Sequence, residues 1–113
     1  MKDINITNRS TFDHVRRADG TSALIFNGED VAPHNPAGWT TYQIIQIVFV
    51  LGALRSSAEY TGGCCHITKD ADIKATAGML EIRGCVWVKY GDKSIASRAA
   101  EVLKVLQQML TDD

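Results

Sequence analysis

The sequence lacks most of the features that would point to a familiar class of function. Basic and acidic residues nearly balance, 12 against 13, and the net charge is −1. Such a balance creates no overall field that would draw the chain to nucleic acid or to an anionic membrane. We find no internal repeat, no Walker loop and no G-x-G-x-x-G motif. A nucleotide-binding fold therefore has no support in the sequence.

Cysteine is scarce, and its count of three is odd. We also find no secretory segment, so we expect reduced thiols and a cytoplasmic protein. On a strand, Cys64 and His66 would share a face, and Cys85 could join them from a neighbouring strand. The paired ligand spacing of a structural zinc site is missing, however. We therefore predict that Cys64, Cys65 and Cys85 are structural and that the protein carries no metal or other cofactor.

Long apolar stretches are also missing. The longest, from Ile44 to Leu54, is well short of the roughly 20 residues that span a bilayer, so we expect no membrane segment. No proline and only one glycine occur from Thr41 to Tyr60. Thr40 and Gln43 have the spacing of a capping box, and Gly62 offers a left-handed C-cap. These signals predict a helix from Thr41 to Tyr60, buried on almost every side, around which the chain is organised.

The segment before this helix admits two interpretations. In the first, Asp19-Gly20 is a two-residue turn within a hairpin from Thr11 to Asn27, and Val15 lies opposite Leu24. In the second, a short capped helix ends at Gly20 and only the segment after it is extended. We favour the hairpin, because the segment after the turn is strand-like in both interpretations.

Alternation of apolar and polar residues predicts the remaining strands. Ile4 and Ile6 alternate with polar neighbours, as in a short edge strand. Residues Met79 to Tyr90 alternate as one longer strand, in which Gly84 marks a bulge or a bend. A shorter strand is expected from Cys64 to Thr68.

Apolar residues recur every three or four positions from Lys93 to Leu110, which predicts a final helix with Asp92 or Ser94 as its N-cap. Strands and helices then follow the order β-β-α-β-β-α, which favours antiparallel pairing. We therefore predict a single compact domain over residues 1–113 of the α+β class. Its expected architecture is an antiparallel sheet of four or five strands with the two helices packed on one face.

Trp87 stands out within the longer strand, because it shares a face with Arg83 and Lys89. Tryptophan and arginine are enriched at the centres of protein interfaces. Val105 similarly falls outside the apolar stripe of the last helix. We predict an interaction surface made of Trp87, Arg83, Lys89 and Val105, through which the protein forms a homodimer. The alternative is that a loop of the same chain covers Trp87.

The only basic concentration is Arg9, Arg16 and Arg17, and His34 precedes the N-terminus of the central helix, where an anion can bind. These four residues are the candidate contacts for an anion or for nucleic acid.

No motif carries a catalytic signature, so we predict that the protein is not an enzyme. We expect a small intracellular binding protein that acts through protein–protein interaction. An inhibitor or modulator of a larger complex, of the kind that phages and mobile elements encode, fits this size. A module that binds a small ligand or nucleic acid is the alternative.

Overall fold

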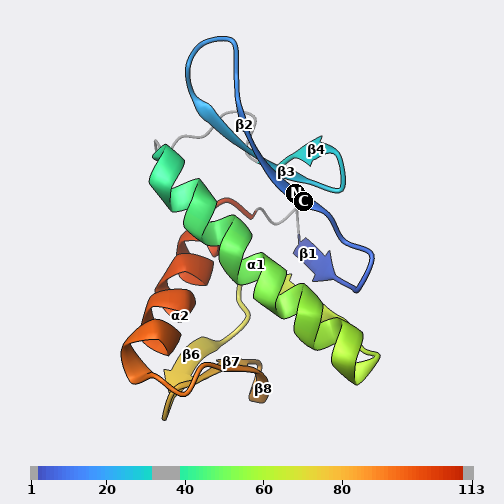
Figure 1. Ribbon diagram of the computed structural model, residues 1–113, viewed down its shortest axis with the longest axis vertical. Coiled ribbons are helices and arrows are strands. Elements are labelled where there is room, and N and C mark those ends of the chain that lie inside the picture. Colours follow the sequence, from blue (N-terminus) through green and yellow to red (C-terminus); the bar gives the residue numbers. More distant parts are fainter. Residues whose placement is uncertain (1–2, 32–38, 111–113) are drawn as a thin grey trace.

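Helix α1 (Thr41–Thr61) is the element that contacts the most other elements in the described part of the chain. The structure is a computed structural model that describes residues 3–31 and 39–110. Strands from three small sheets contact α1, and so does the second helix, α2 (Lys93–Gln107) (Figure 1). The prediction that the chain is organised around this apolar helix is confirmed.

The strands of the described residues form three separate antiparallel sheets. One contains β1 (Asp3–Ile6) and β5 (Cys65–Thr68); the second has the order β2–β3–β4, and the third has the order β6–β7–β8. The bounds of these six strands are β2 (Phe12–Arg16), β3 (Ser22–Phe26), β4 (Glu29–Asp30), β6 (Ile73–Thr76), β7 (Met79–Ile82) and β8 (Cys85–Lys89). The α+β class is confirmed, whereas the prediction of one sheet of four or five strands is wrong.

Two-residue turns join neighbouring strands within two of the three sheets. Asn27-Gly28, Ala77-Gly78 and Arg83-Gly84 each place two consecutive residues at positive φ. This is the backbone of a type I′ hairpin turn, which returns the chain along the strand that it has just left. Strands joined in this way pair with their immediate neighbours in sequence, as they do in β3–β4 and in β6–β7–β8.

The prediction of a single strand from Met79 to Tyr90 is wrong, because one of these turns interrupts it. Arg83-Gly84 divides it into the hairpin β7–β8, so Gly84 lies in a turn and not in a bulge. The irregularity in pairing lies elsewhere, between Leu80 and Glu81.

The hairpin interpretation of residues 11–27 is confirmed, but its register differs by one residue from the predicted one. Val15 pairs with Ala23 and not with Leu24. The predicted two-residue turn is a longer loop, closed by the Arg17 N–H donating to the Thr21 carbonyl over 2.7 Å. The longer loop shifts the pairing, so His14 now stands opposite Leu24.

Both predicted caps of α1 are present. Thr40 Oγ1 accepts the Gln43 N–H at 3.1 Å, and Gln43 Oε1 accepts the Thr40 N–H at 2.9 Å, which completes the capping box. Gly62, at φ 72°, ends the helix, and its N–H donates to the Ala58 carbonyl at 2.9 Å. The observed helix is therefore one residue longer than the predicted one.

Of the two predicted caps of α2, the structure selects Asp92. Its Oδ1 accepts the N–H groups of Ser94 and Ile95 at 2.8 and 3.2 Å. The helix ends at Gln107, three residues before the predicted end, and it packs against β6 and β7 as well as α1.

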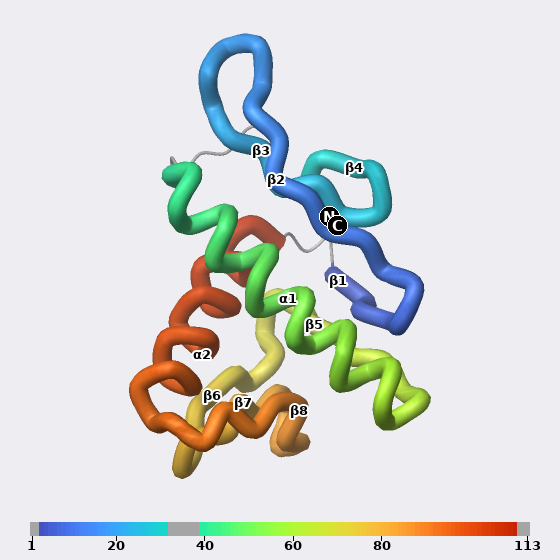
Figure 2. The backbone as a smooth tube through the Cα atoms, viewed as in Figure 1, coloured from blue at the N-terminus to red at the C-terminus, as the bar shows by residue number. Residues whose placement is uncertain are grey.

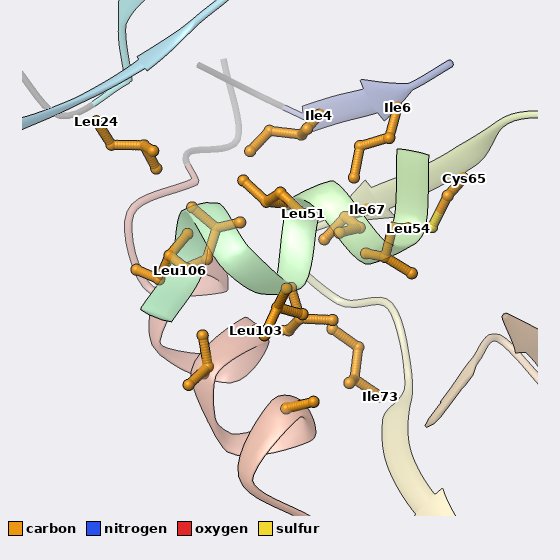
Figure 3. Packing of buried hydrophobic residues seen from close by; sticks show 14 of the residues in the cluster. Ile4, Ile6, Leu24, Leu51, Leu54, Cys65, Ile67, Ile73, Leu103 and Leu106 are labelled. Atoms are coloured by element: carbon orange, nitrogen blue, oxygen red, sulfur yellow. The ribbon is translucent and has the colours of Figure 1, made fainter. Parts of the chain in front are cut away.

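The core lies between the two helices and the inner faces of the strands. Figure 3 shows buried side chains from both helices meeting those of β1, β3 and β5, among them Ile4, Ile6, Leu24, Leu51, Leu54, Ile67, Leu103 and Leu106. Among the residues that the structure describes, no helix combines the length and the apolar character needed to cross a membrane.

Candidate functional site

Helix α1 has two apolar faces, and only one of them is buried. Ile44, Leu51 and Leu54 on the inner face are completely buried. On the opposite face, Phe49 is 77% exposed and Ile45 is 50% exposed. A helix that is apolar all round is normally covered all round. The prediction that α1 is buried on almost every side is therefore wrong for the single chain.

The exposed face extends along the whole length of α1, because its residues recur at the three- and four-residue spacing of one helix face. We call it the bare face, and it consists of Tyr42, Ile45, Phe49, Gly52, Ala53, Ser56 and Tyr60. Tyr42 and Tyr60, which are 62% and 93% exposed, stand near its two ends. The bare face thus combines large aromatic side chains with small residues.

No charged residue lies on the bare face. The only charged residues of α1 are Arg55 and Glu59. The Arg55 guanidinium donates to the Ser10 carbonyl at 3.0 Å and lies 5.5 Å from the ring centre of Phe12, so it faces β2. Glu59 is exposed at the edge of the bare face, three positions after Ser56. A surface face that is this long and uncharged is unusual for a solvated helix.

Figure 2 shows α2 beside α1. A groove lined by both helices opens beside the N-terminal half of the bare face. Its volume is about 530 Å³, and the side chains of Tyr42, Ile45, Phe49, Ile95 and Val102 contribute to its mostly apolar lining. Ile95, on α2, is 51% exposed. The groove therefore extends the apolar surface of α1 sideways onto α2.

One polar pair spans the two helices at this groove. With the Gln46 amide turned so that its oxygen faces α2, that oxygen accepts from Nε and Nη2 of Arg98 at 3.1 and 3.2 Å. The same pair also lines a smaller groove of about 180 Å³ on its other side. Because Gln46 and Arg98 bond to each other, they stabilise the contact between the helices.

The structure places the four predicted interface residues in two locations. Arg83, Trp87 and Lys89 all belong to the β7–β8 hairpin, but they do not share the predicted strand face, because exposed Arg83 lies in the turn and exposed Lys89 pairs with Met79 at the opposite end. Trp87 is partly buried against the core, and its carbonyl accepts a hydrogen bond from Ser57 of α1. Val105 lies apart from them on α2, where it lines the smaller groove.

The predicted anion contacts are not gathered into one site by the described residues. Arg17 forms a bidentate ion pair with Asp30, in which Nη2 lies 2.7 Å from Oδ2. Its guanidinium also donates to the Ser22 carbonyl. Its guanidinium thus ties the loop of the hairpin to β4. Arg9 and Arg16 are exposed. The fourth contact, His34, lies outside the described residues.

The thiols differ in their surroundings. Cys64 and Cys85 are exposed, whereas Cys65 is completely buried, and this burial raises the pKa of its thiol to about 12. A thiol with so high a pKa is a poor nucleophile at neutral pH. His66 bonds to the Asp3 carboxylate at 2.6 Å on the outside of β1 and β5. Within residues 3–31 and 39–110, no three His, Cys, Asp or Glu side chains are grouped so that they could hold a metal ion.

One histidine–serine contact has the residue types of a hydrolytic site. His14 Nε2 lies 3.1 Å from the Ser22 hydroxyl, which in turn lies 2.7 Å from the Thr41 hydroxyl. Ser22 is buried, and in the described part of the chain no carboxylate bonds to the His14 ring to orient it. A nucleophile needs access to substrate and an oriented base. This chain of hydrogen bonds instead fixes the β2–β3 hairpin to the start of α1.

Neither a family model, nor a curated protein, nor a solved structure matches this chain. The assignment of a function therefore depends on the surfaces of the molecule itself. Of these, the bare face with its groove is the most unusual, and the sequence analysis did not identify it. The signal was present, since α1 carries no charge from Thr41 to Leu54 and so has no evident solvent face.

Proposed function

We propose that this chain is a non-catalytic protein-binding module and that its contact surface is the bare face of α1 with the adjoining groove. One observation carries the proposal: α1 is apolar on both faces, and the fold covers only one of them. An uncovered, uncharged face with large aromatic side chains has the composition of a protein interface. A single exposed apolar residue would not support this proposal, but Tyr42, Ile45 and Phe49 lie side by side.

The chemistry of the surface favours a protein over the other classes of partner. Nucleic acid is bound chiefly through arginine and lysine contacts to phosphate. The bare face has no charge, and Arg98, the cation that lines the groove, bonds to Gln46. The groove has the volume of a small-molecule site, but such sites usually present polar groups to the ligand. Here Gln46 and Arg98 bond to each other. An apolar element of another protein, such as one face of a helix, fits this surface better.

The test is a binding measurement with a matched control. Proteins retained by the immobilised chain are identified, produced separately and titrated against it by calorimetry. Phe49→Asp, which places a charge in the centre of the bare face, should weaken binding at least tenfold, while Lys104→Ala on the exposed side of α2 should leave it unchanged. Wild-type binding should have a negative heat-capacity change, because apolar surface is buried. A partner that binds the Phe49→Asp variant as tightly as the wild type would contradict the proposal.

A further inference from the structure

We propose that the partner on the bare face is a second copy of this chain, with the two α1 helices packed antiparallel about a two-fold axis at the level of Leu51. This inference rests on the proposed function, because it names the partner of that same surface. It also assigns the predicted homodimer to α1, where the sequence analysis had assigned it to the surface around Trp87.

The bare face carries both a protruding side chain and a recess that can receive it. Phe49 is 77% exposed and projects from the middle of α1. In helix packing, a protruding side chain inserts among four residues of the facing helix at positions i, i+3, i+4 and i+7. Next to Phe49 these positions are Phe49, Gly52, Ala53 and Ser56. Three of the four are small, so the Phe49 ring of a second copy fits among them.

Phe49 and the small residues that would receive it lie on the same face of α1, at a spacing compatible with a two-fold axis. A symmetric dimer uses the same patch on both chains, so the patch must be complementary to itself. In an antiparallel pair centred at Leu51, Phe49 lies opposite Ala53 of the second copy, two positions on either side of the centre. Tyr42 and Tyr60 are each nine positions from Leu51, so they also face each other across the pair. Both ends of the contact are then aromatic.

Charge does not oppose this arrangement. The bare face has no charged residue, so two copies can meet without a contact between like charges. Arg55 is engaged with Ser10 and Phe12 on the side of β2, away from the contact. An unrelated partner would more commonly select its site through complementary charges, and the bare face offers none for such a selection.

The exposed area suits a dimer of standard size. An aromatic side chain buries about 150–250 Å². From their exposed fractions, Tyr42, Phe49 and Tyr60 together leave on the order of 450 Å² in water. Each partner of a standard interface contributes about 800 Å². Ile45 and Ile95, each about half exposed, and the small residues between the aromatic side chains supply much of the remainder.

The antiparallel register can be tested by cross-linking through single cysteines. Exposed Cys64 and Cys85 are first replaced by serine, and buried Cys65 is retained. Ala53→Cys should then link two chains efficiently with a short bismaleimide, because both copies of residue 53 lie close to the axis. Tyr42→Cys should not link to itself, because its two copies stand about 27 Å apart along an antiparallel pair of helices. A mixture of Tyr42→Cys and Tyr60→Cys chains should give mixed dimers.

Each outcome decides the proposal. Efficient linking of Ala53→Cys and of the Tyr42–Tyr60 mixture, lost when Phe49→Asp is added, supports the antiparallel pair. If Tyr42→Cys links to itself as efficiently as it links to Tyr60→Cys, the pair is parallel. If Ala53→Cys links no more than a Lys104→Cys control, the two α1 helices do not pair. Either result overturns the inference. The proposed function fails separately, if a reconstituted partner binds Phe49→Asp as well as the wild type.

Discussion

Gly52 is the residue that the single chain explains least. It lies in the middle of α1, where a glycine lowers helix stability by about 1 kcal/mol relative to alanine. A Cβ added to Gly52 would meet no atom within 4 Å, so nothing in the fold requires a glycine there. Close approach of a second helix does require a small residue at this point. The fold of the single chain therefore tolerates a larger residue at position 52, whereas the proposed pair of helices requires a small one.

Gly52→Ala should raise the free energy of unfolding by about 1 kcal/mol in a Phe49→Asp background, which keeps the chain monomeric. Gly78→Ala is the matched control and should be destabilising. Gly78 has φ +81°, and its added Cβ would lie 3.1 Å from the Gly91 carbonyl carbon. Urea denaturation of the three proteins measures both effects. A loss of stability in the Gly52→Ala variant would show that the fold itself needs this glycine.

The buried Cys65 thiol should make the free energy of unfolding fall at alkaline pH. Below pH 9 its thiol is protonated in both the folded and the unfolded chain. Between pH 9 and about 12, the unfolded thiol loses its proton while the buried one keeps it, because burial raises the pKa of the folded thiol. The unfolded state then binds fewer protons, so stability falls as pH rises. At pH 10 this loss should be about 1 kcal/mol.

Urea denaturation at pH 8 and pH 10 should therefore show a larger loss for the wild type than for Cys65→Ala, which has no thiol to titrate at this position. The comparison is between two pH values within each protein, so the stability lost to the cavity in Cys65→Ala is the same at both pH values and cancels. Equal losses in the two proteins would mean that the Cys65 thiol titrates in the folded chain as it does in the unfolded one.

At the scale of the element, the start of α1 depends on the reciprocal bonds between Thr40 and Gln43. Thr40→Ala removes the acceptor for the Gln43 N–H, and we expect the free energy of unfolding to fall by about 0.5–2 kcal/mol. Ser97→Ala, at an exposed position inside α2, should cause no comparable loss. The two urea midpoints measure the difference, and an unchanged midpoint for Thr40→Ala would show that the cap contributes no stability.

The elements themselves were largely predictable from the sequence. Both helices and the Thr40 cap follow from local spacing, and the sequence limited the cap of α2 to Asp92 or Ser94, because an N-cap bonds to backbone groups two or three positions further on. The division at Arg83-Gly84 was not predictable in this way. Arginine rarely adopts positive φ, so nothing in the local composition distinguishes this turn from a glycine bulge within one strand.

At the scale of the whole molecule, the α+β class was predictable and the grouping into three sheets was not. Grouping depends on which strands meet in space, and β1 meets β5 across more than fifty intervening residues. The bare face was missed for a related reason. An apolar helix with no evident solvent face suggests complete burial, and the sequence does not show whether its own chain or a second chain provides the cover.

The central claim is that the second apolar face of α1 serves association and not folding. Sedimentation equilibrium of the wild type, Phe49→Asp and Lys104→Ala across the micromolar range tests it most directly. The wild type and Lys104→Ala should approach twice 12.4 kDa as concentration rises, while Phe49→Asp should remain at 12.4 kDa with its circular dichroism spectrum unchanged. A wild-type mass of 12.4 kDa at every concentration, or a Phe49→Asp variant that forms the same dimer, would contradict the account.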